Sequence, residues 1–167
     1  MRTLRKTIRK IILEMSDEEW AKTPRGMEYL KYHDDSRADA AIQEMTTIFK
    51  DAYSFEAGSW GNEFDVYEMK DEPEPGCIVR IRVYRMWGAV TLDEIETTPE
   101  CEGKGYAQAA IAKIKAIVKK HGILLQLKPK AFHRHKGEGR MGDAGLRKWY
   151  ESQGFKPKGT YWMEYKW

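Results

Sequence analysis

The chain has 167 residues, 41% of them hydrophobic, which suits one domain of ordinary size and makes a second domain unexpected. Its net charge of +3 hides a split: residues 51–100 hold 4 Lys and Arg against 12 Asp and Glu, whereas residues 101–167 hold 15 against 5. The two cysteines, Cys77 and Cys101, are too few for a disulfide framework, so we expect reduced thiols in a cytoplasmic protein. No stretch has the length of a membrane span or the pattern of a signal peptide, so we expect no contact with a membrane.

The first third of the chain predicts mostly helix. Residues 4–13 alternate well enough for a strand, with a helix as the alternative. Ser16 and the three acidic residues after it are typical of a helix start, and Pro24-Arg25-Gly26 should end whatever begins there. A long helix is expected between Ser36 and Phe55, because apolar residues recur there at helical spacing. They are Ala38, Ala41, Ile42, Met45, Ile48, Phe49 and Ala52.

Three strands are predicted next, over residues 63–70, 77–87 and 89–98, from apolar residues that alternate with polar ones. A proline-rich loop at 72–76 separates the first two strands, and Gly88 lets the chain turn between the second and the third. Consecutive strands joined in this way are expected to pair antiparallel.

A glycine-rich turn, Glu102 to Ala107, leads from the third strand into a helix that should end before Gly122. The first N–H groups of a helix have no partners within it and carry the positive end of its dipole. Because Gly103 and Gly105 lack side chains, a phosphate could approach these N–H groups, with Lys104 nearby for charge. A plain glycine turn that enters an amphipathic helix is the alternative.

The end of the chain predicts a strand, a helix and a final strand. Residues 123–127 form an apolar run typical of a strand buried on both faces, and the preceding helix implies parallel pairing with the strand at 89–98. Asp143 is expected as the N-cap of a helix that ends at Gly154-Phe155. The tail, 160–167, alternates as a last strand, whose aromatic residues suit either the core or a homodimer surface.

In this order, the segments from about residue 87 to 155 resemble the GNAT N-acetyltransferase superfamily. In that family the segment (Gln/Arg)-x-x-Gly-x-(Gly/Ala) binds the pyrophosphate of acetyl-CoA, and it matches Glu102 to Ala107 here. The family pattern Asn-x-x-Ala-x-x-x-Tyr-x-x-x-Gly-Phe matches the run from Asp143 to Phe155, with Tyr150 at the tyrosine. Three positions depart from the family: Glu102 stands for Gln or Arg, Asp143 for Asn, and Leu146 for Ala.

The resemblance implies one GNAT-type α/β domain over 1–167, with a mainly antiparallel sheet, a central parallel pair that splays apart, and flanking helices. Residues 1–60 would be its variable part, 61–155 its acetyl-CoA core and 156–167 its C-terminal strand. The implied reaction is transfer of acetyl from acetyl-CoA to a primary amine by direct attack, with Tyr150 donating a hydrogen bond or a proton to the leaving thiolate. The implied acetyl-CoA-binding residues are Ile95, Glu96, Thr97, Glu102, Gly103, Lys104, Gly105, Tyr106, Ala107, Gln108 and Asp143.

The acceptor amine must lose a proton, and the acids of the strand at 89–98 are the candidates to accept it. Glu94 and Glu96 share a face by strict alternation, and Asp93 takes the opposite face unless a bulge intervenes. We predict that Glu94 and Glu96 act directly or through water, with an acidic strand face that has only a structural role as the alternative. The acidic balance of residues 51–100 predicts a cationic acceptor, either a small molecule or a peptide or protein.

The basic region 128–148 leaves other functions open, because its lysines and arginines could bind the 3′-phosphate of CoA or a nucleic acid. The chain could then be a GNAT-fold nucleic-acid-binding module with weak or no catalysis, or an acetyltransferase that acts on a nucleic-acid-linked amine. No metal site is expected, because His133-x-His135 has no accompanying cysteines or carboxylates.

Overall fold

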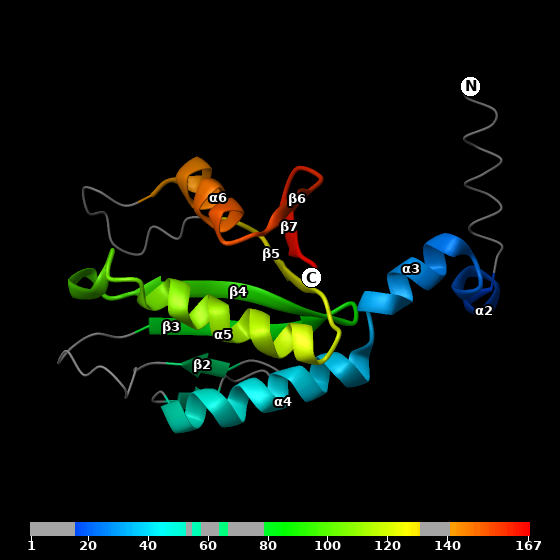
Figure 1. Ribbon diagram of the computed structural model, residues 1–167, viewed down its shortest axis with the longest axis horizontal. Helices are drawn as coiled ribbons and strands as arrows, with labels where there is room; N and C mark the ends of the chain where they lie inside the picture. Colours follow the sequence, from blue (N-terminus) through cyan, green and yellow to red (C-terminus); the bar gives the residue numbers. More distant parts are fainter. Residues whose placement is uncertain (1–15, 53–54, 58–63, 67–78, 131–140) are drawn as a thin grey trace.

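The computed structural model describes residues 16–52, 55–57, 64–66, 79–130 and 141–167 (Figure 1). The predicted strand at 4–13, the proline-rich loop at 72–76, Cys77 and the pair His133-x-His135 lie outside these residues. Within the described ranges, no helix has both the length and the apolar character needed to cross a membrane.

The described residues contain seven strands, which form one mixed sheet in the order β1-β2-β3-β4-β5-β7-β6. Neighbouring strands pair antiparallel, except for β4 and β5, which run parallel. The strands are β1 (Phe55–Ala57), β2 (Phe64–Val66), β3 (Val79–Met86), β4 (Ala89–Thr97), β5 (Leu125–Leu127), β6 (Lys156–Lys158) and β7 (Trp162–Tyr165).

The predicted strand pairings are confirmed around β4. The antiparallel pairs β2–β3 and β3–β4 form as expected, and β5 pairs parallel with β4, with Leu92 opposite Leu127 as the last pair. β5 ends at Leu127, whereas β4 continues to Thr97, so the two strands part beyond Leu92. The sequence did not predict β1 and β6, which have 3 residues each.

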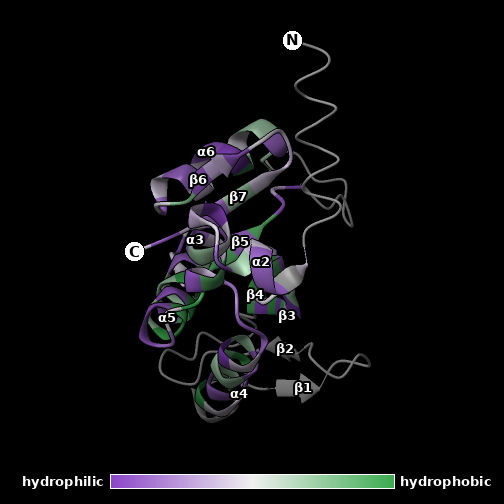
Figure 2. Ribbon diagram, turned by 90° about the vertical axis from the view of Figure 1, so that its right-hand side faces the viewer, coloured by the Kyte–Doolittle hydropathy of each residue, from purple (hydrophilic) through white to green (hydrophobic). Residues whose placement is uncertain are grey.

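Two helices, α4 (Asp35–Ala52) and α5 (Tyr106–Lys120), pack on one face of the sheet and confirm the two long helices predicted. Met45 of α4, Ile114 of α5 and Ile81 of β3 are fully buried in the core between them. Figure 1 shows α5 lying across β3 and β4, and in Figure 2 the hydrophobic, green stretches gather in α5 and the central strands.

Strand alternation places another set of side chains on the face opposite α4 and α5, which we call the second face. Val79, Ile81 and Val83 point into the core, so the residues between them point to the second face. The second face includes Arg80 and Arg82 of β3, Thr91 of β4, Gln126 of β5, Lys128 after it, and Trp162 of β7.

Two short helices precede α4. Ser16 caps α2 (Asp17–Ala21) and forms a capping box with Glu19, which confirms the predicted helix start. α2 ends before Pro24 as predicted, but Pro24 then begins another helix, α3 (Pro24–Tyr32), with Thr23 as its N-cap. Proline fits at the first helical position because an N–H there would have no partner within the helix.

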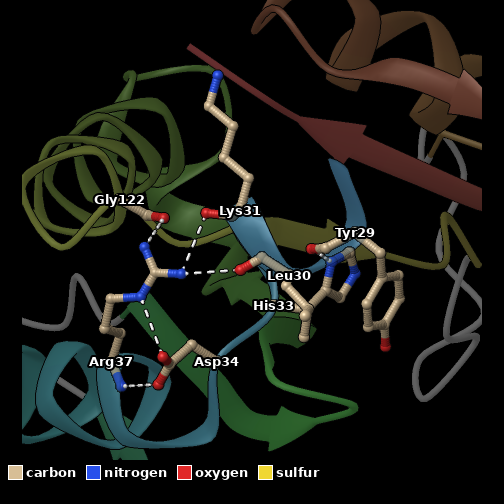
Figure 3. Close-up of polar contacts among 7 residues, drawn as sticks. All are labelled: Tyr29, Leu30, Lys31, His33, Asp34, Arg37 and Gly122. Atoms are coloured by element: carbon tan, nitrogen blue, oxygen red, sulfur yellow. Dashed lines mark hydrogen bonds and ion pairs between the residues drawn. The ribbon is translucent and has the colours of Figure 1, made fainter. Parts of the chain in front are cut away.

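Arg37 joins the first turn of α4 to the ends of two other helices (Figure 3). Its Nη1 donates a hydrogen bond to the carbonyl of Gly122 at 2.9 Å, and its Nη2 donates to the carbonyls of Leu30 and Lys31 at 3.1 Å. Its Nε lies 3.5 Å from the carboxylate of Asp34. Since Gly122 follows α5 and the other two carbonyls end α3, one side chain fixes three helix ends together.

Candidate active site

A pocket of 510 Å³ lies where β4 and β5 part. Its walls are the end of β4, the turn after it, the first residues of α5, and α6 (Asp143–Ser152). The predicted catalytic residues Glu94, Glu96 and Tyr150 all line it. So do these predicted acetyl-CoA-binding residues: Ile95, Glu96, Thr97, Glu102, Gly103, Gly105, Tyr106, Ala107 and Gln108.

The glycine turn has the backbone conformation that only glycine adopts easily. Gly103 has φ 75° and Gly105 has φ 86°, both in the left-handed region. Gly105 is the N-cap of α5, and it offers no side-chain acceptor to the N–H groups of the first helical turn. A Cβ built on either glycine would meet no protein atom within 4 Å. The main chain at Gly103 and Gly105 is therefore uncrowded on its Cβ side, and an anion near the start of α5 would meet N–H groups that have no acceptor within the helix.

Two predicted acetyl-CoA-binding residues are not among those that line the pocket. Lys104 is exposed in the glycine turn, and Asp143 is the first residue of α6. The prediction that Asp143 is the N-cap is wrong by one residue, because Gly142 occupies that position. A residue at the cap position needs a β-region backbone, which Gly142 has and a residue in the first helical turn does not.

A β-bulge decides where the acids of β4 point. Arg82 of β3 pairs with Glu94, and the next residue, Val83, pairs with Leu92, so Asp93 is an extra residue with no partner in the register. Strict alternation would have placed Asp93 on the helix face. The bulge instead brings Asp93 to the same side as Glu94, because one guanidinium reaches both of their carboxylates.

These acids form a partly neutralised cluster on the second face. Nη1 of Arg82 lies 3.3 Å from Oε2 of Glu94 and 3.7 Å from Oδ2 of Asp93. Glu94 is only 5% exposed, whereas the side chain of Asp93 is 38% exposed and lines the pocket. Glu96 pairs in register with Arg80, two residues further along the ladder. Asp93 is thus a third candidate to accept a proton, and it is the most accessible of the bulged pair.

A helix end fixes Tyr150 in the pocket. The N–H of Phe155 donates to the carbonyl of Tyr150 at 3.1 Å, and the N–H of Gly154 donates to that of Glu151 at 2.9 Å. With Gly154 at φ 87°, this is a Schellman motif, in which the residues at its two ends pack against each other. The rings of Tyr150 and Phe155 do so, at a centroid distance of 5.5 Å. The Tyr-x-x-x-Gly-Phe spacing therefore has a local physical cause: it terminates α6 and anchors its tyrosine.

Burial sets the protonation of Tyr150, which is only 5% exposed. Desolvation raises the pKa of its hydroxyl above the ordinary value of 10.0. The hydroxyl is therefore neutral throughout the physiological range and acts as a hydrogen-bond donor.

Several pocket residues were not among the predicted catalytic or acetyl-CoA-binding residues, although Leu146 stands in the family pattern and Lys128 and Lys130 lie in the basic region 128–148. Lys128 and Lys130 line the pocket beside the acids, and Met141, Leu146 and Trp149 close it on the side of α6. Lys128 follows the last residue of β5 and Asp93 follows the last paired residue of β4, so both stand where the two strands part.

Cys101 also lines the pocket, directly before the glycine turn, and it differs from the expected free thiol. It is disulfide-bonded and 1% exposed, and Oγ1 of Thr98 lies 3.0 Å from its sulfur. The prediction of reduced thiols is therefore wrong for Cys101.

Among the described residues, no group of three or more His, Cys, Asp or Glu side chains comes together as a metal site.

No protein-family model matches the chain, and no curated protein matches it. Among solved structures it is similar to the PaiA N-acetyltransferase from Thermoplasma acidophilum in complex with coenzyme A, at 20% identity and a TM-score of 0.44, over 64% of this chain and 62% of that one. It is similar to Tetrahymena GCN5 at 13% identity and a TM-score of 0.43, over 86% and 89% of the two chains. It is also similar to the anti-CRISPR protein AcrVA5 at 18% identity and a TM-score of 0.44, over 53% and 90%. These likenesses concern the arrangement of elements, and we take no activity from them.

The sheet is mixed, and its parallel pair β4–β5 parts beside the pocket. A glycine turn opens the crossover helix α5, and α6, which carries Tyr150, follows β5. These elements confirm the predicted architecture, a mainly antiparallel mixed sheet with a central parallel pair that parts and with flanking helices.

Proposed function

We propose that this protein is an acetyl-CoA-dependent N-acetyltransferase that transfers the acetyl group to a primary amine. The observation that carries the proposal is the convergence of three features in one pocket: a glycine turn with open space over its main chain, the acids of the β4 bulge, and the hydroxyl of Tyr150. A protein that only bound nucleic acid would not need these three features in the same pocket.

The residues present fit acetyl-CoA. The first N–H groups of α5 would hold its diphosphate, since a Cβ at Gly103 or Gly105 finds no protein atom within 4 Å. The backbone of Ile95 to Thr97 would hold the pantetheine arm, because this part of β4 lies beyond its last pair with β5. When bound, acetyl-CoA supplies a thioester whose acyl carbon a neutral amine can attack.

In the overall transfer, the amine nitrogen forms a bond to the acyl carbon, the carbon–sulfur bond breaks, and the electron pair leaves with the sulfur. The ammonium form of the acceptor first gives up one proton, because only a neutral amine attacks. The carboxylates of Asp93, Glu94 and Glu96 would take that proton, directly or through water, since all three line the pocket.

Tyr150 would stabilise the departing thiolate with a hydrogen bond. Full proton transfer is uphill by at least about 2 kcal/mol, because a thiol has a pKa of about 8.5 and burial raises the pKa of this phenol above 10.0. The hydroxyl therefore keeps its proton, and the thiolate is protonated by solvent.

Tyr150→Phe tests this assignment, since phenylalanine keeps the packing against Phe155 and loses only the hydroxyl. A hydrogen bond to a charged group contributes about 1.5–3 kcal/mol, so we expect kcat to fall by about 10- to 100-fold. The Kd of acetyl-CoA, measured by isothermal titration calorimetry, should stay within about twofold. Tyr161→Phe is the matched control, because Tyr161 is 74% exposed and does not line the pocket.

Two outcomes would contradict the proposal. One is the absence of acetyl-CoA binding by calorimetry together with the absence of acetylated products, by mass spectrometry, from a panel of primary amines. The other is a Tyr150→Phe variant that transfers acetyl as fast as the wild type, which would remove Tyr150 from the reaction.

A further inference from the structure

Trp87 is placed where folding alone would not put a tryptophan. It forms the turn between β3 and β4 with Gly88, and its φ is 54°, the one non-glycine residue with a positive φ among the described residues. A tight two-residue hairpin turn of this kind favours Asn-Gly, because a bulky side chain is strained in the left-handed region. The side chain of Trp87 is also 66% exposed, so burial does not offset this strain. A strained and exposed aromatic residue points to a role other than folding.

The turn is held so that Trp87 faces a second tryptophan. Oη of Tyr29 donates a hydrogen bond to the carbonyl of Trp87 at 3.2 Å, and the N–H of Asp34 donates to that of Gly88 at 2.8 Å. The ring of Trp87 lies 6.1 Å from the ring of Trp162 on β7, centroid to centroid. The two rings thus form an aromatic surface, which we call the tryptophan pair.

The second face continues from the tryptophan pair to the pocket. Nζ of Lys128 lies 4.4 Å from the ring centroid of Trp162, and Lys128 lines the pocket together with Asp93. Between the two sites, Nε2 of Gln126 donates hydrogen bonds to Oγ1 of Thr91 and to the carbonyl of Met86, the residue before Trp87. Lys128 thus connects the pocket, which holds the carboxylate of Asp93, with the two indole rings, while the Gln126 and Thr91 side chains are buried at 5% and 2% exposed.

We propose that the acceptor is a primary amine joined through a phosphate to a nucleoside. The ammonium would bind at the carboxylates of Asp93 and Glu94, the phosphate at Lys128, and the base on the tryptophan pair, because lysine pairs with phosphate and indole rings stack on bases. This inference rests on the proposed acetyl transfer and adds the chemical class of the acceptor. The nitrogen of this amine forms the bond to the acyl carbon, and the carbon–sulfur bond breaks, as in the proposed transfer.

Three acceptors that grow by one group at a time test the proposal. They are hexylamine, 6-aminohexyl phosphate, and the phosphodiester of 6-aminohexanol with adenosine 5′-phosphate. With the wild type, we expect kcat/KM to rise by about tenfold for each added group, as one charged contact and one base stack would give. Equal kcat/KM for all three would overturn the inference and leave the acetyltransferase intact.

Lys128→Met tests the phosphate contact. We expect this variant to lose most of the gain between hexylamine and 6-aminohexyl phosphate while the Kd of acetyl-CoA stays within about twofold. Lys119→Met is the control, because Lys119 is exposed in the last turn of α5 and does not line the pocket. A loss of acetyl-CoA affinity as large as the loss for the acceptor would place Lys128 on the cofactor side and overturn the inference.

Trp87→Asn tests the base contact by comparing two quantities, the melting temperature and the gain in kcat/KM on adding adenosine. A purely structural role of Trp87 would change the first and not the second. Asparagine followed by glycine suits this turn, so the melting temperature should stay level or rise, by up to about 4 °C. The gain on adding adenosine should nevertheless disappear. A fall in melting temperature with the adenosine gain intact would make Trp87 a structural residue and overturn the inference.

Two further outcomes would also overturn it. If the wild type forms a dimer by analytical ultracentrifugation and Trp87→Asn abolishes it, the tryptophan pair binds a second copy of the chain. If calorimetry shows acetyl-CoA binding but none of the three acceptors is acetylated, the acceptor belongs to another class. A failure of acetyl-CoA binding itself is a different result, because it removes the proposed function and the inference with it.

Discussion

Replacing Gly105 by alanine should separate backbone strain from ligand binding. An alanine in the left-handed region costs about 1–2 kcal/mol, and its smaller unfolded-state entropy offsets about 0.4–1 kcal/mol of this. No clash adds to that cost, because a Cβ at Gly105 meets no protein atom within 4 Å. We therefore expect Gly105→Ala to lower the free energy of unfolding by about 1 kcal/mol, which lowers the melting temperature by about 2–4 °C.

The effect on acetyl-CoA should be much larger, since the same Cβ would stand where the diphosphate approaches the first N–H groups of α5. In the wild type, acetyl-CoA at 100 times its Kd adds about 2.7 kcal/mol, a rise in melting temperature of about 5–10 °C. If one charge-assisted contact worth about 2.7 kcal/mol is lost, Kd rises about 100-fold. At the same concentration the ligand then adds only about 0.4 kcal/mol, a rise of about 1 °C.

Gly159→Ala is the matched control for this experiment. Gly159 has φ 62°, a Cβ there also meets nothing within 4 Å, and the residue does not line the pocket. It should lose the same stability as Gly105→Ala and keep the full rise with acetyl-CoA in differential scanning fluorimetry. A Gly105→Ala variant that also keeps the full rise would refute the assignment of the glycine turn as the diphosphate site.

Two further predictions concern stability. Arg37→Met removes hydrogen bonds to three backbone carbonyls, so the free energy of unfolding, measured in urea, should fall by about 2–4 kcal/mol. Arg25→Met is the control, because Arg25 is exposed. A loss below about 1 kcal/mol, or an equal loss in Arg25→Met, would mean that the helix ends stay together without Arg37. Hydrogen bonds from Lys120 and His121 lower the pKa of Glu44 below its ordinary 4.5. The Glu44 carboxylate therefore contributes to the free energy of unfolding above about pH 4.5, and this contribution is lost as the pH falls through the folded-state pKa. The stability difference between the wild type and Glu44→Gln should therefore shrink in urea titrations from pH 7 to pH 3.5, and a constant difference would contradict this linkage.

Elements with a local signal could be predicted from the order of the amino acids. The apolar stripes of α4 and α5 repeat at helical spacing over several turns, and the alternation in β3 and β4 identifies both strands. The glycine turn and the end of α6 were also predictable, because a left-handed residue next to a helix end needs glycine wherever the chain then goes. The crossover through α5 fixed the parallel pairing of β4 with β5 before any contact was known.

The assembly of the site, in contrast, depends on strand register and on packing between distant elements. Whether Asp93 joins Glu94 depends on one extra residue in the register with β3, and that register is set by pairing with Val83 and Arg82, which lie 9 and 12 positions from their partners Leu92 and Glu94. The placement of Lys128 opposite Asp93 depends on where the β4–β5 ladder stops, and the contact between Trp87 and Trp162 depends on how β7 adds to the sheet. The periodicity of apolar residues indicates which face of a helix or strand is buried. It does not indicate which distant side chains come into contact, because packing and strand register determine those contacts.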